Sequence, residues 1–305
     1  MELLGERDTH RCDVTNRTPF WAESVKAPPR LISSTPGAST LQWTHLQFSL
    51  PVLISHLDSA YFGVPMKIEY ASLPGEVPPP VPDGPRLCSG DDMRILHNAF
   101  LWGYEQAPEL VRAVLSGDTN RSKFVGEWLS NLDKTLHIHH ESEDLLLWEK
   151  LETRSPGCAL HVGQMRAHHA QVASLLNDAS PLLEQWTTTA DTRIGEQLAE
   201  AYERLLEVLR VHLRREVVEV VPIAEKVLTA EEWEAIGEHS RAAIPKSRLL
   251  PQLGMLFANS SPEDRAAFYA TMPAAVKLLW KVSGRRQYKH EYEHLFPGEP
   301  IPETI

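Results

Sequence analysis

The sequence between Leu132 and Trp148 reads LDKTLHIHHESEDLLLW and predicts a helix that carries candidate metal ligands on its buried face. A helix returns to the same face every three or four residues. One face counted in this way consists of Trp128, Leu132, Leu136, His139, Glu143 and Leu146. Its apolar residues predict a core-facing stripe, which a histidine and a glutamate interrupt. Burying an imidazole and a carboxylate is costly unless a partner such as a metal ion satisfies them.

A second stretch, YERLLEVLRVHLRREVVEVVPI between Tyr202 and Ile223, repeats this pattern further along the chain. Its apolar face consists of Tyr202, Leu205, Leu209, His212, Glu216 and Ile223. A single histidine–glutamate pair is weak evidence for a metal site. Two such pairs, each embedded in its own apolar face, are much stronger evidence that the ligands meet in a shared core.

The composition is that of an acidic globular protein. The chain has 305 residues, of which 42% are hydrophobic, and a formal net charge of -11. This charge argues against a nucleic-acid partner or an anionic membrane. Cys12, Cys88 and Cys158 are widely separated and form no CxxC motif, which favours a reducing, cytoplasmic environment over a disulfide framework. No stretch is apolar and long enough to predict a signal peptide or a membrane span.

The pattern divides the chain into three parts. Residues 1–88 are rich in proline and lack a sustained apolar period, so we expect an irregular N-terminal extension. One reading is that the protein begins at Met66, which would leave the first 65 residues outside the native chain. Residues 89–228 predict a four-helix domain with a di-metal site. Residues 229–305 predict a helical C-terminal extension that packs on this domain, and the last nine residues should be disordered.

The four long amphipathic helices are expected at residues 91–115, 122–152, 158–186 and 192–227, with Pro108, Pro181 and Pro222 as bends. Because short turns place neighbouring helices antiparallel, the fold class is all-α, an up-down four-helix bundle. In the extension, Thr229 and Glu232 form a capping box, and Ser261 followed by Pro262 should begin another helix.

Each predicted helix offers at least one ligand at an interior position. The candidates are His97, His139 with Glu143, one histidine of the third helix, and His212 with Glu216. On the third helix, the spacing from Met165 and Val172 allows His168 and His169 equally.

Several neighbouring polar residues are interpreted differently. His137 and His140 should lie off the buried face, although His140 and Asp144 form a rival pair with the same spacing. Glu219 is expected in solvent, and His161 is not expected to be a ligand.

Four histidines and two carboxylates exceed the four ligands of a tetrahedral zinc ion, which indicates two metal ions bridged by the glutamates. Bundle cores with paired carboxylate and histidine ligands are typical of di-iron and di-manganese sites, and imidazole suits iron. Because neutral histidines outnumber carboxylates, we expect a site that favours the reduced metal and reversible binding of small ligands.

These segments resemble the haemerythrin-like, HHE cation-binding family over roughly residues 91–228. The resemblance is carried by His97, HHESEDLLLW, RAHHAQV and VHLRREVVEVVP, and MPAAVKLLWKVSGRRQY resembles the helical extension of actinobacterial members. It implies that His97, His139, Glu143, His169, His212 and Glu216 hold two iron ions in a non-haem di-iron centre, which manganese or zinc would fit less well. Oxygen carriers of this family have a second third-helix histidine where this sequence has Met165, so one iron would lose a protein ligand.

The predicted function is binding, sensing or scavenging of O2, NO or peroxide at this His4Glu2 site, with a redox partner that the sequence does not indicate. One competing hypothesis is an oxidative enzyme, whose C-terminal helices would form a substrate cavity near Trp233, Phe257 or Trp280. The pattern also allows an iron-donating repair protein or a structural zinc bundle. The sequence leaves open whether the protein is an enzyme.

Overall fold

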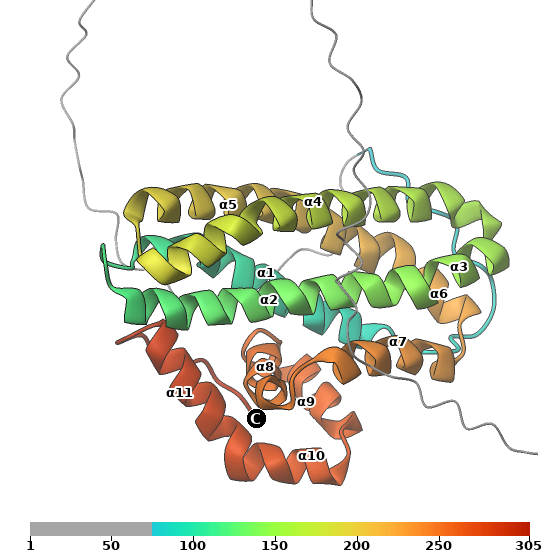
Figure 1. Ribbon diagram of the computed structural model, residues 1–305. Coiled ribbons are helices and arrows are strands. Elements are labelled where there is room, and N and C mark those ends of the chain that lie inside the picture. The colour runs from blue at the N-terminus through green and yellow to red at the C-terminus, as the bar shows by residue number, and fades with distance from the viewer. Residues whose placement is uncertain (1–74) are drawn as a thin grey trace, which may run out of the picture. The chain divides into compact units, whose positions relative to one another are not determined.

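The computed structural model describes residues 75–305 (Figure 1). The expectations for residues 1–74, including the proposed start at Met66, lie outside the described residues. Residues 75–90 run without helix or strand before the first helix. Throughout residues 75–305 the regular structure is helical, and no helix there has the length and apolar character needed to cross a lipid bilayer.

The helical elements follow one another with short connections. They are α1 (Asp91–Arg112), α2 (Thr119–Leu146), α3 (Trp148–Arg154), the 3-10 turn η2 (Pro156–Cys158), α4 (Ala159–Thr189), α5 (Thr192–Arg215), the π-helical turn η3 (Glu216–Val220), α6 (Val221–Val227), α7 (Ala230–Ala243), α8 (Lys246–Ala258), α9 (Pro262–Thr271), α10 (Ala274–Leu279), the π-helical turn η4 (Trp280–Gly284) and α11 (Arg285–Leu295).

The helices α1, α2, α4 and α5 form a four-helix bundle, which confirms the predicted fold class. In this bundle α1 packs against α5, α5 against α4, α4 against α2, and α2 against α1. Figure 1 shows α2, α4 and α5 running alongside one another over most of their length. Short turns join sequential helices, so each helix reverses the direction of the one before it.

Local capping explains where several helices begin. The side chain of Asp118 accepts a hydrogen bond from the backbone of Arg121 at the start of α2, and Asp191 caps α5 in the same way. The predicted capping box of Thr229 and Glu232 begins α7, and Ser261 caps α9. These side chains satisfy backbone N–H groups that have no partner within the helix.

Two predicted helices are interrupted near the candidate ligands. The second was expected to continue to Glu152, but α2 ends at Leu146 and α3 begins at Trp148, where Leu147 and Trp148 are fully buried. The fourth was expected to run to Val227 with a bend at Pro222. Instead, the π-helical turn η3 begins at Glu216, and Pro222 lies in the first turn of α6, where its missing N–H costs nothing. Pro108 and Pro181 lie within continuous helices.

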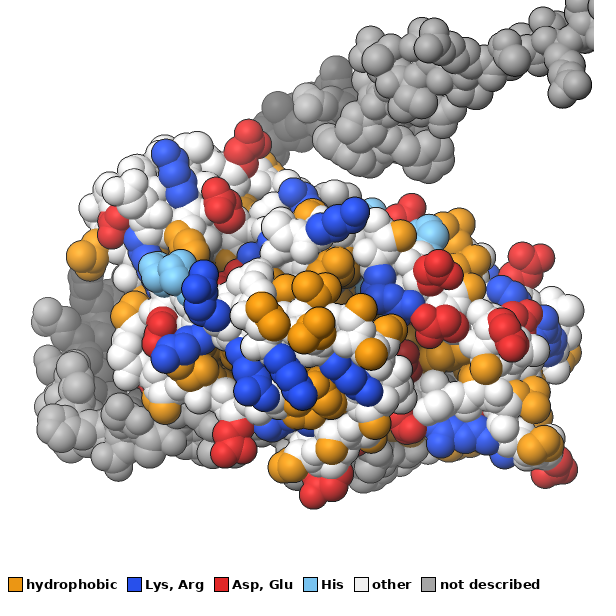
Figure 2. Space-filling model, turned by 90° about the horizontal axis from the view of Figure 1, so that it is seen from below, with side chains coloured by type: hydrophobic (Ala, Val, Ile, Leu, Met, Phe, Trp, Pro, Cys, Tyr) orange, Lys and Arg blue, Asp and Glu red, His pale blue; other side chains and the backbone are white. Residues whose placement is uncertain are grey.

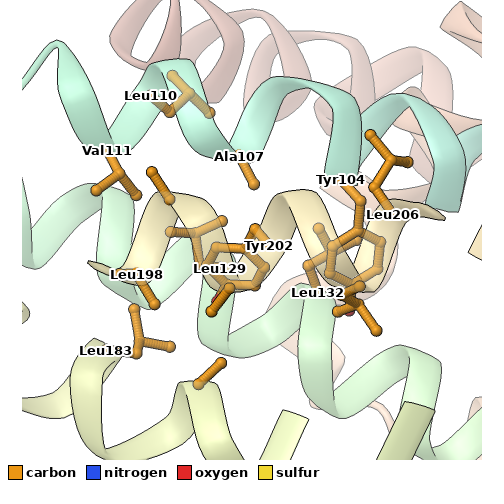
Figure 3. Close-up of a cluster of buried hydrophobic side chains, with 14 of the residues drawn as sticks. Tyr104, Ala107, Leu110, Val111, Leu129, Leu132, Leu183, Leu198, Tyr202 and Leu206 are labelled. Atoms are coloured by element: carbon orange, nitrogen blue, oxygen red, sulfur yellow. The ribbon is translucent and has the colours of Figure 1, made fainter. Parts of the chain in front are cut away.

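Two apolar clusters fill the bundle. The first lies between α1, α2, α4 and α5, and Figure 3 shows part of it, including Tyr104, Leu129 and Tyr202. The second cluster lies toward α3, α6 and α7 and includes Met93, Trp148 and Met165. Along each bundle helix, the candidate ligands lie between residues of these two clusters.

The C-terminal helices pack on the bundle. The helix α7 contacts α2, while α8 contacts α1 and α11. Arg94 of α1 forms an ion pair with Asp264 of α9 at 2.7 Å, and the side-chain amide of Gln252 donates a hydrogen bond to the Thr135 hydroxyl at 2.8 Å. Figure 2 shows the face seen from below, where hydrophobic side chains lie beside lysines and arginines.

The last residues also contact this extension. The backbone carbonyl of Ile305 accepts a hydrogen bond from the Trp280 indole at 2.6 Å and another from Arg285. The expected disorder of the last nine residues is therefore wrong for Ile305. Trp280 is fully buried in a third apolar cluster, formed by α8, α9, η4 and α11, so the end of the chain lies against a packed group of side chains.

Candidate metal centre

Seven buried histidine and glutamate side chains converge in the middle of the bundle. Each is at most 5% exposed. They are His97 of α1, His139, His140 and Glu143 of α2, His169 of α4, His212 of α5 and Glu216 at the start of η3. The structure therefore brings together all six residues predicted as ligands and adds His140.

The first group of donors contains His97 and His139. Their Nε2 atoms lie 3.0 Å apart, and these two residues, Glu143 and Glu216 each offer a ligand atom within 4.8 Å of the others. The Phe100 ring lies beside this group, with its centroid 5.3 Å from that of His139. One side of the site is thus bounded by an apolar ring.

The second group of donors contains His140, His169 and His212, whose ligand atoms also lie within 4.8 Å of one another. The Nε2 atoms of His140 and His212 are 3.2 Å apart, and the rings of His140 and His169 stack with centroids 4.2 Å apart. His140 and His212 can share one hydrogen bond between their Nε2 atoms, but His169 Nε2 then has no partner among the described residues. A shared cation would use all three nitrogens together.

The two glutamates lie between these groups. The Oε1 atom of Glu143 is 3.1 Å from His139 Nε2, and its Oε2 atom is 3.4 Å from His169 Nε2. The Oε2 atom of Glu216 is 3.6 Å from His97 Nε2 and 3.8 Å from His212 Nε2. Each carboxylate therefore faces one imidazole of each group, which is the arrangement that two bridged cations require.

Hydrogen bonds on the outer nitrogens orient two of the rings. His97 Nδ1 lies 3.1 Å from the Leu213 carbonyl, to which it donates. His169 Nδ1 lies 2.9 Å from Asp144 Oδ1, which also accepts a hydrogen bond from the Trp148 indole at 2.7 Å. Fixing the proton on Nδ1 leaves Nε2 unprotonated and directed into the cluster, as a metal ligand requires.

Unpartnered buried atoms indicate that a cation fits this site. Both carboxylate oxygens of Glu143, both of Glu216 and the Nε2 atom of His169 are buried without a hydrogen-bond partner among the described residues. Such groups are costly in a protein interior because they have lost their hydration. A cation between them would satisfy all five atoms.

Burial also sets the protonation of these groups. It lowers the pKa of His97 to about 3 and holds the pKa values of His139, His140 and His212 well below the ordinary value. These four imidazoles are therefore neutral, as metal ligands must be. Burial likewise raises the pKa of Glu216 to about 8, so a cation entering at neutral pH would displace a proton from the carboxyl group.

The predicted position of His140 off the buried face is wrong. Its neighbour His139 contacts His97 of α1, while His140 contacts His212 of α5 and His169 of α4. Adjacent residues point about 100° apart on a helix, and here α2 has partners over an arc wide enough to bury both. Asp144, the other member of the rival pair, orients His169 instead of joining the cluster.

The structure distinguishes the two third-helix histidines. His169 belongs to the second group, whereas His168 belongs to neither, and its ring centroid lies 5.7 Å from that of His212. Met165 is fully buried in the second apolar cluster. The cluster therefore contains five imidazoles although residue 165 is a methionine, because His140 of α2 supplies the fifth.

The expectation that Glu219 lies in solvent is also wrong. Glu219 is only 2% exposed and forms an ion pair with Arg215 at 3.0 Å. Its other oxygen lies 4.0 Å from His161 Nε2. The π-helical turn η3 directs Glu219 inward, and a count based on a regular helix does not register such a turn.

Comparison with known proteins agrees with this site. Residues 91–224 match the family model of the Hemerythrin HHE cation binding domain, a range that contains all seven residues of the cluster. No curated protein and no solved structure matches the chain. The match, the helical bundle and the histidine–glutamate cluster together identify residues 91–224 as a cation-binding domain of the hemerythrin HHE family.

Proposed function

We propose that the seven residues of the cluster hold two iron ions and that this centre binds O2, NO or peroxide. The observation that carries the proposal is the position of Glu143 and Glu216, each of which faces an imidazole of both donor groups. Carboxylates placed in this way serve two cations at once. The protein would bind, sense or scavenge its small ligand through this pair.

The donor set favours iron over zinc. Five imidazoles and two carboxylates exceed what a tetrahedral zinc ion uses, and mixed nitrogen and oxygen ligands suit iron. When bound at this site, iron would supply the reversible binding of oxygen or nitric oxide. The first donor group has two imidazoles and the second has three, so a small ligand would meet fewer imidazoles on the His97–His139 side.

The chain contributes shielding and orientation. Its ligand side chains are at most 5% exposed, so bulk water is kept away from the site. The Leu213 carbonyl and the Asp144 carboxylate hold His97 and His169 with Nε2 inward. Such burial argues against an iron donor, because a donated ion has to leave through packed side chains.

Metal analysis of protein purified without oxygen tests the proposal. We expect two iron ions per chain and an absorption spectrum that changes when O2, NO or peroxide is added. A spectral change that reverses when oxygen is removed would support a carrier or sensor. Repeated consumption of the added ligand would support a scavenger. Zinc as the bound metal, or two iron ions that respond to none of the three, would contradict the proposal.

Replacement of His140 by alanine should reduce the iron content from two ions to about one per chain. The reason is that His140 is one of only three imidazoles on its side of the site. Iron content and the spectrum with NO are the measurements. His137→Ala is the matched control, because His137 is exposed on the same helix. Full iron content and an unchanged spectrum in His140→Ala would contradict a ligand role for His140 and would favour the four-histidine site predicted from the sequence.

A cavity next to His139 favours a second candidate function, an oxidative enzyme that acts on a small molecule. Among the aromatic residues expected to line it, Trp233 does so, whereas Phe257 and Trp280 belong to the third apolar cluster. Oxidation of a bound organic molecule by the metal-loaded protein in the presence of O2 and a reductant would distinguish this enzyme from a carrier.

A further inference from the structure

A cavity of about 190 Å³ lies between the bundle and the C-terminal helices. Its walls come mainly from α1 and α2 on one side and from α7 and α8 on the other, with single residues of α9 and α11. Most of the lining is apolar and includes Phe100, Trp128, Trp233, Met255, Leu256 and Phe268. A space lined in this way suits an apolar molecule better than a group of ordered waters.

The cavity ends at the metal centre. His139 lines it, and the Phe100 ring that borders the cavity lies 5.3 Å from the His139 ring, centroid to centroid. His139 belongs to the donor group with two imidazoles. A molecule in the cavity would therefore lie on the side of the site where the protein supplies fewer imidazoles.

The outer wall comes from the part of the chain beyond the family match. Residues 91–224 match the family model, whereas Trp233, Met255 and Phe268 follow it. Specific bonds attach this wall to the bundle, including Gln252 to Thr135 at 2.8 Å and Arg94 to Asp264 at 2.7 Å. The extension thus adds an outer wall to one face of the bundle, and the cavity between them stays partly open to solvent.

One hydrogen-bond donor of the lining lacks a partner. The terminal nitrogens of Arg248 pair with Glu291, but its Nε atom is buried without a hydrogen-bond partner among the described residues. Two other polar side chains of the lining have hydrogen-bond partners, since Asp92 accepts a hydrogen bond from the Trp233 indole and Gln252 donates one to Thr135. An oxygen acceptor on a ligand would satisfy the Nε–H group of Arg248.

We infer that this cavity binds a small apolar molecule of about one ring, which carries one oxygen acceptor for Arg248. The size follows from the volume, because an apolar cavity of roughly 150 Å³ accommodates benzene, and this one is somewhat larger. Binding of this molecule is independent of the metal. Its role as the substrate of the neighbouring centre rests on the second candidate function, the oxidative enzyme.

Two nearly isosteric probes test the inference, acetophenone with a carbonyl oxygen and cumene without one. Titration calorimetry on the full chain should give one site per chain for both, with acetophenone about tenfold tighter, as expected for a hydrogen bond to a charged donor. Arg248→Lys, which removes Nε and keeps the charge, should abolish that difference. Failure of the wild-type chain to bind either probe would overturn the inference.

Filling the cavity provides the second arm. Met255→Trp should weaken both probes at least tenfold, whereas Leu249→Trp, on the exposed side of the same helix, should leave them unchanged. Unchanged binding to a folded Met255→Trp protein would contradict the inference. If that variant does not fold, the location is decided by paramagnetic broadening of the probe's NMR signals, which should occur in iron-loaded and not in metal-free protein.

These measurements separate the inference from the proposed function. Probe binding by a chain that takes up no iron would support the cavity and contradict the di-iron centre. An iron-loaded chain that responds to NO but binds neither probe would support the di-iron centre and contradict the binding site in the cavity.

Discussion

Replacing Glu143 with glutamine should remove most of the metal from both positions of the centre. Glu143 faces His139 with one oxygen and His169 with the other, so both donor groups lose a charged ligand. Structural zinc sites, taken as a guide, bind with about 10–16 kcal/mol over about four ligands, or roughly 3 kcal/mol for each, which is about 100-fold in affinity. Iron content per chain, measured after dialysis against a mild chelator, should fall to a small fraction of that of the wild type.

Glu141→Gln is the matched control, because Glu141 is exposed on the same helix and the substitution changes the net charge by the same amount. This variant should keep its iron. Since glutamine has nearly the size of glutamate, Glu143→Gln should also fold. Retention of one firmly bound iron by Glu143→Gln would show that Glu143 serves a single ion and does not bridge two.

The metal-free protein should lose stability as the pH rises from 6.5 to 8. Burial raises the pKa of Glu216 to about 8 and also raises the pKa of Glu143, so the folded state holds protons that the unfolded chain releases. A raised carboxyl pKa contributes stability that is present below the unfolded value and disappears as the pH passes the folded value. For Glu216 alone the loss over this interval is about 2 kcal/mol, a substantial part of a typical folding free energy.

Histidines act in the opposite direction at lower pH. Because burial lowers the pKa of His97 to about 3, and those of three other cluster histidines well below the ordinary value, acid below pH 6.5 protonates the unfolded chain preferentially. Between pH 6.5 and 8 the unfolded histidines lose their remaining protons, so these four histidines add about 1.6 kcal/mol of stability, which offsets most of the loss from Glu216 alone. The net decline over this interval therefore depends on the second carboxyl group, Glu143, whose pKa burial also raises.

Urea unfolding of metal-free protein at several pH values measures the effect. Iron-loaded protein is one control, because bound carboxylates are ionised and the decline between pH 6.5 and 8 should disappear. Glu216→Gln is the other, since it removes one titrating group and should make the decline of the metal-free protein shallower. An equal decline in the loaded and metal-free proteins would contradict the prediction.

Helical periodicity was sufficient to predict the bundle and the inward direction of five candidate ligands, whereas the choice of His169 over His168 depended on the family resemblance. His139 and Glu143 interrupt one apolar face, and His212 and Glu216 interrupt another, and the structure places all four in the core. This works because a buried face has to be apolar unless its polar groups are satisfied together. A regular helix keeps such a pattern readable over several turns.

His140 could not be predicted in this way. A single helix face excludes the neighbour of an inward residue, but α2 has α1 on one side and α4 on another. His140 and His139 therefore point inward toward different partners. The signal in the sequence was the rival pair of His140 and Asp144, whose two members both contact His169.

The irregular turns were also beyond the sequence pattern. The break at Leu147 and the π-helical turn that begins at Glu216 change the spacing within a helix, and no residue type specifies them uniquely. Pro222 indicated an irregularity but placed it at the wrong residue. Glu219 was misjudged for this reason, since its burial depends on the local winding of the turn.

The histidine–glutamate layer divides the hydrocarbon interior of the bundle into two halves. Each of the four long helices passes from one half to the other through this layer. Apolar contacts hold each half together, but at the layer the helices meet through imidazoles and carboxyl groups. Two bound metal ions would cross-link the four helices there. Occupancy of the centre would therefore determine whether the two ends of the domain unfold as one cooperative unit.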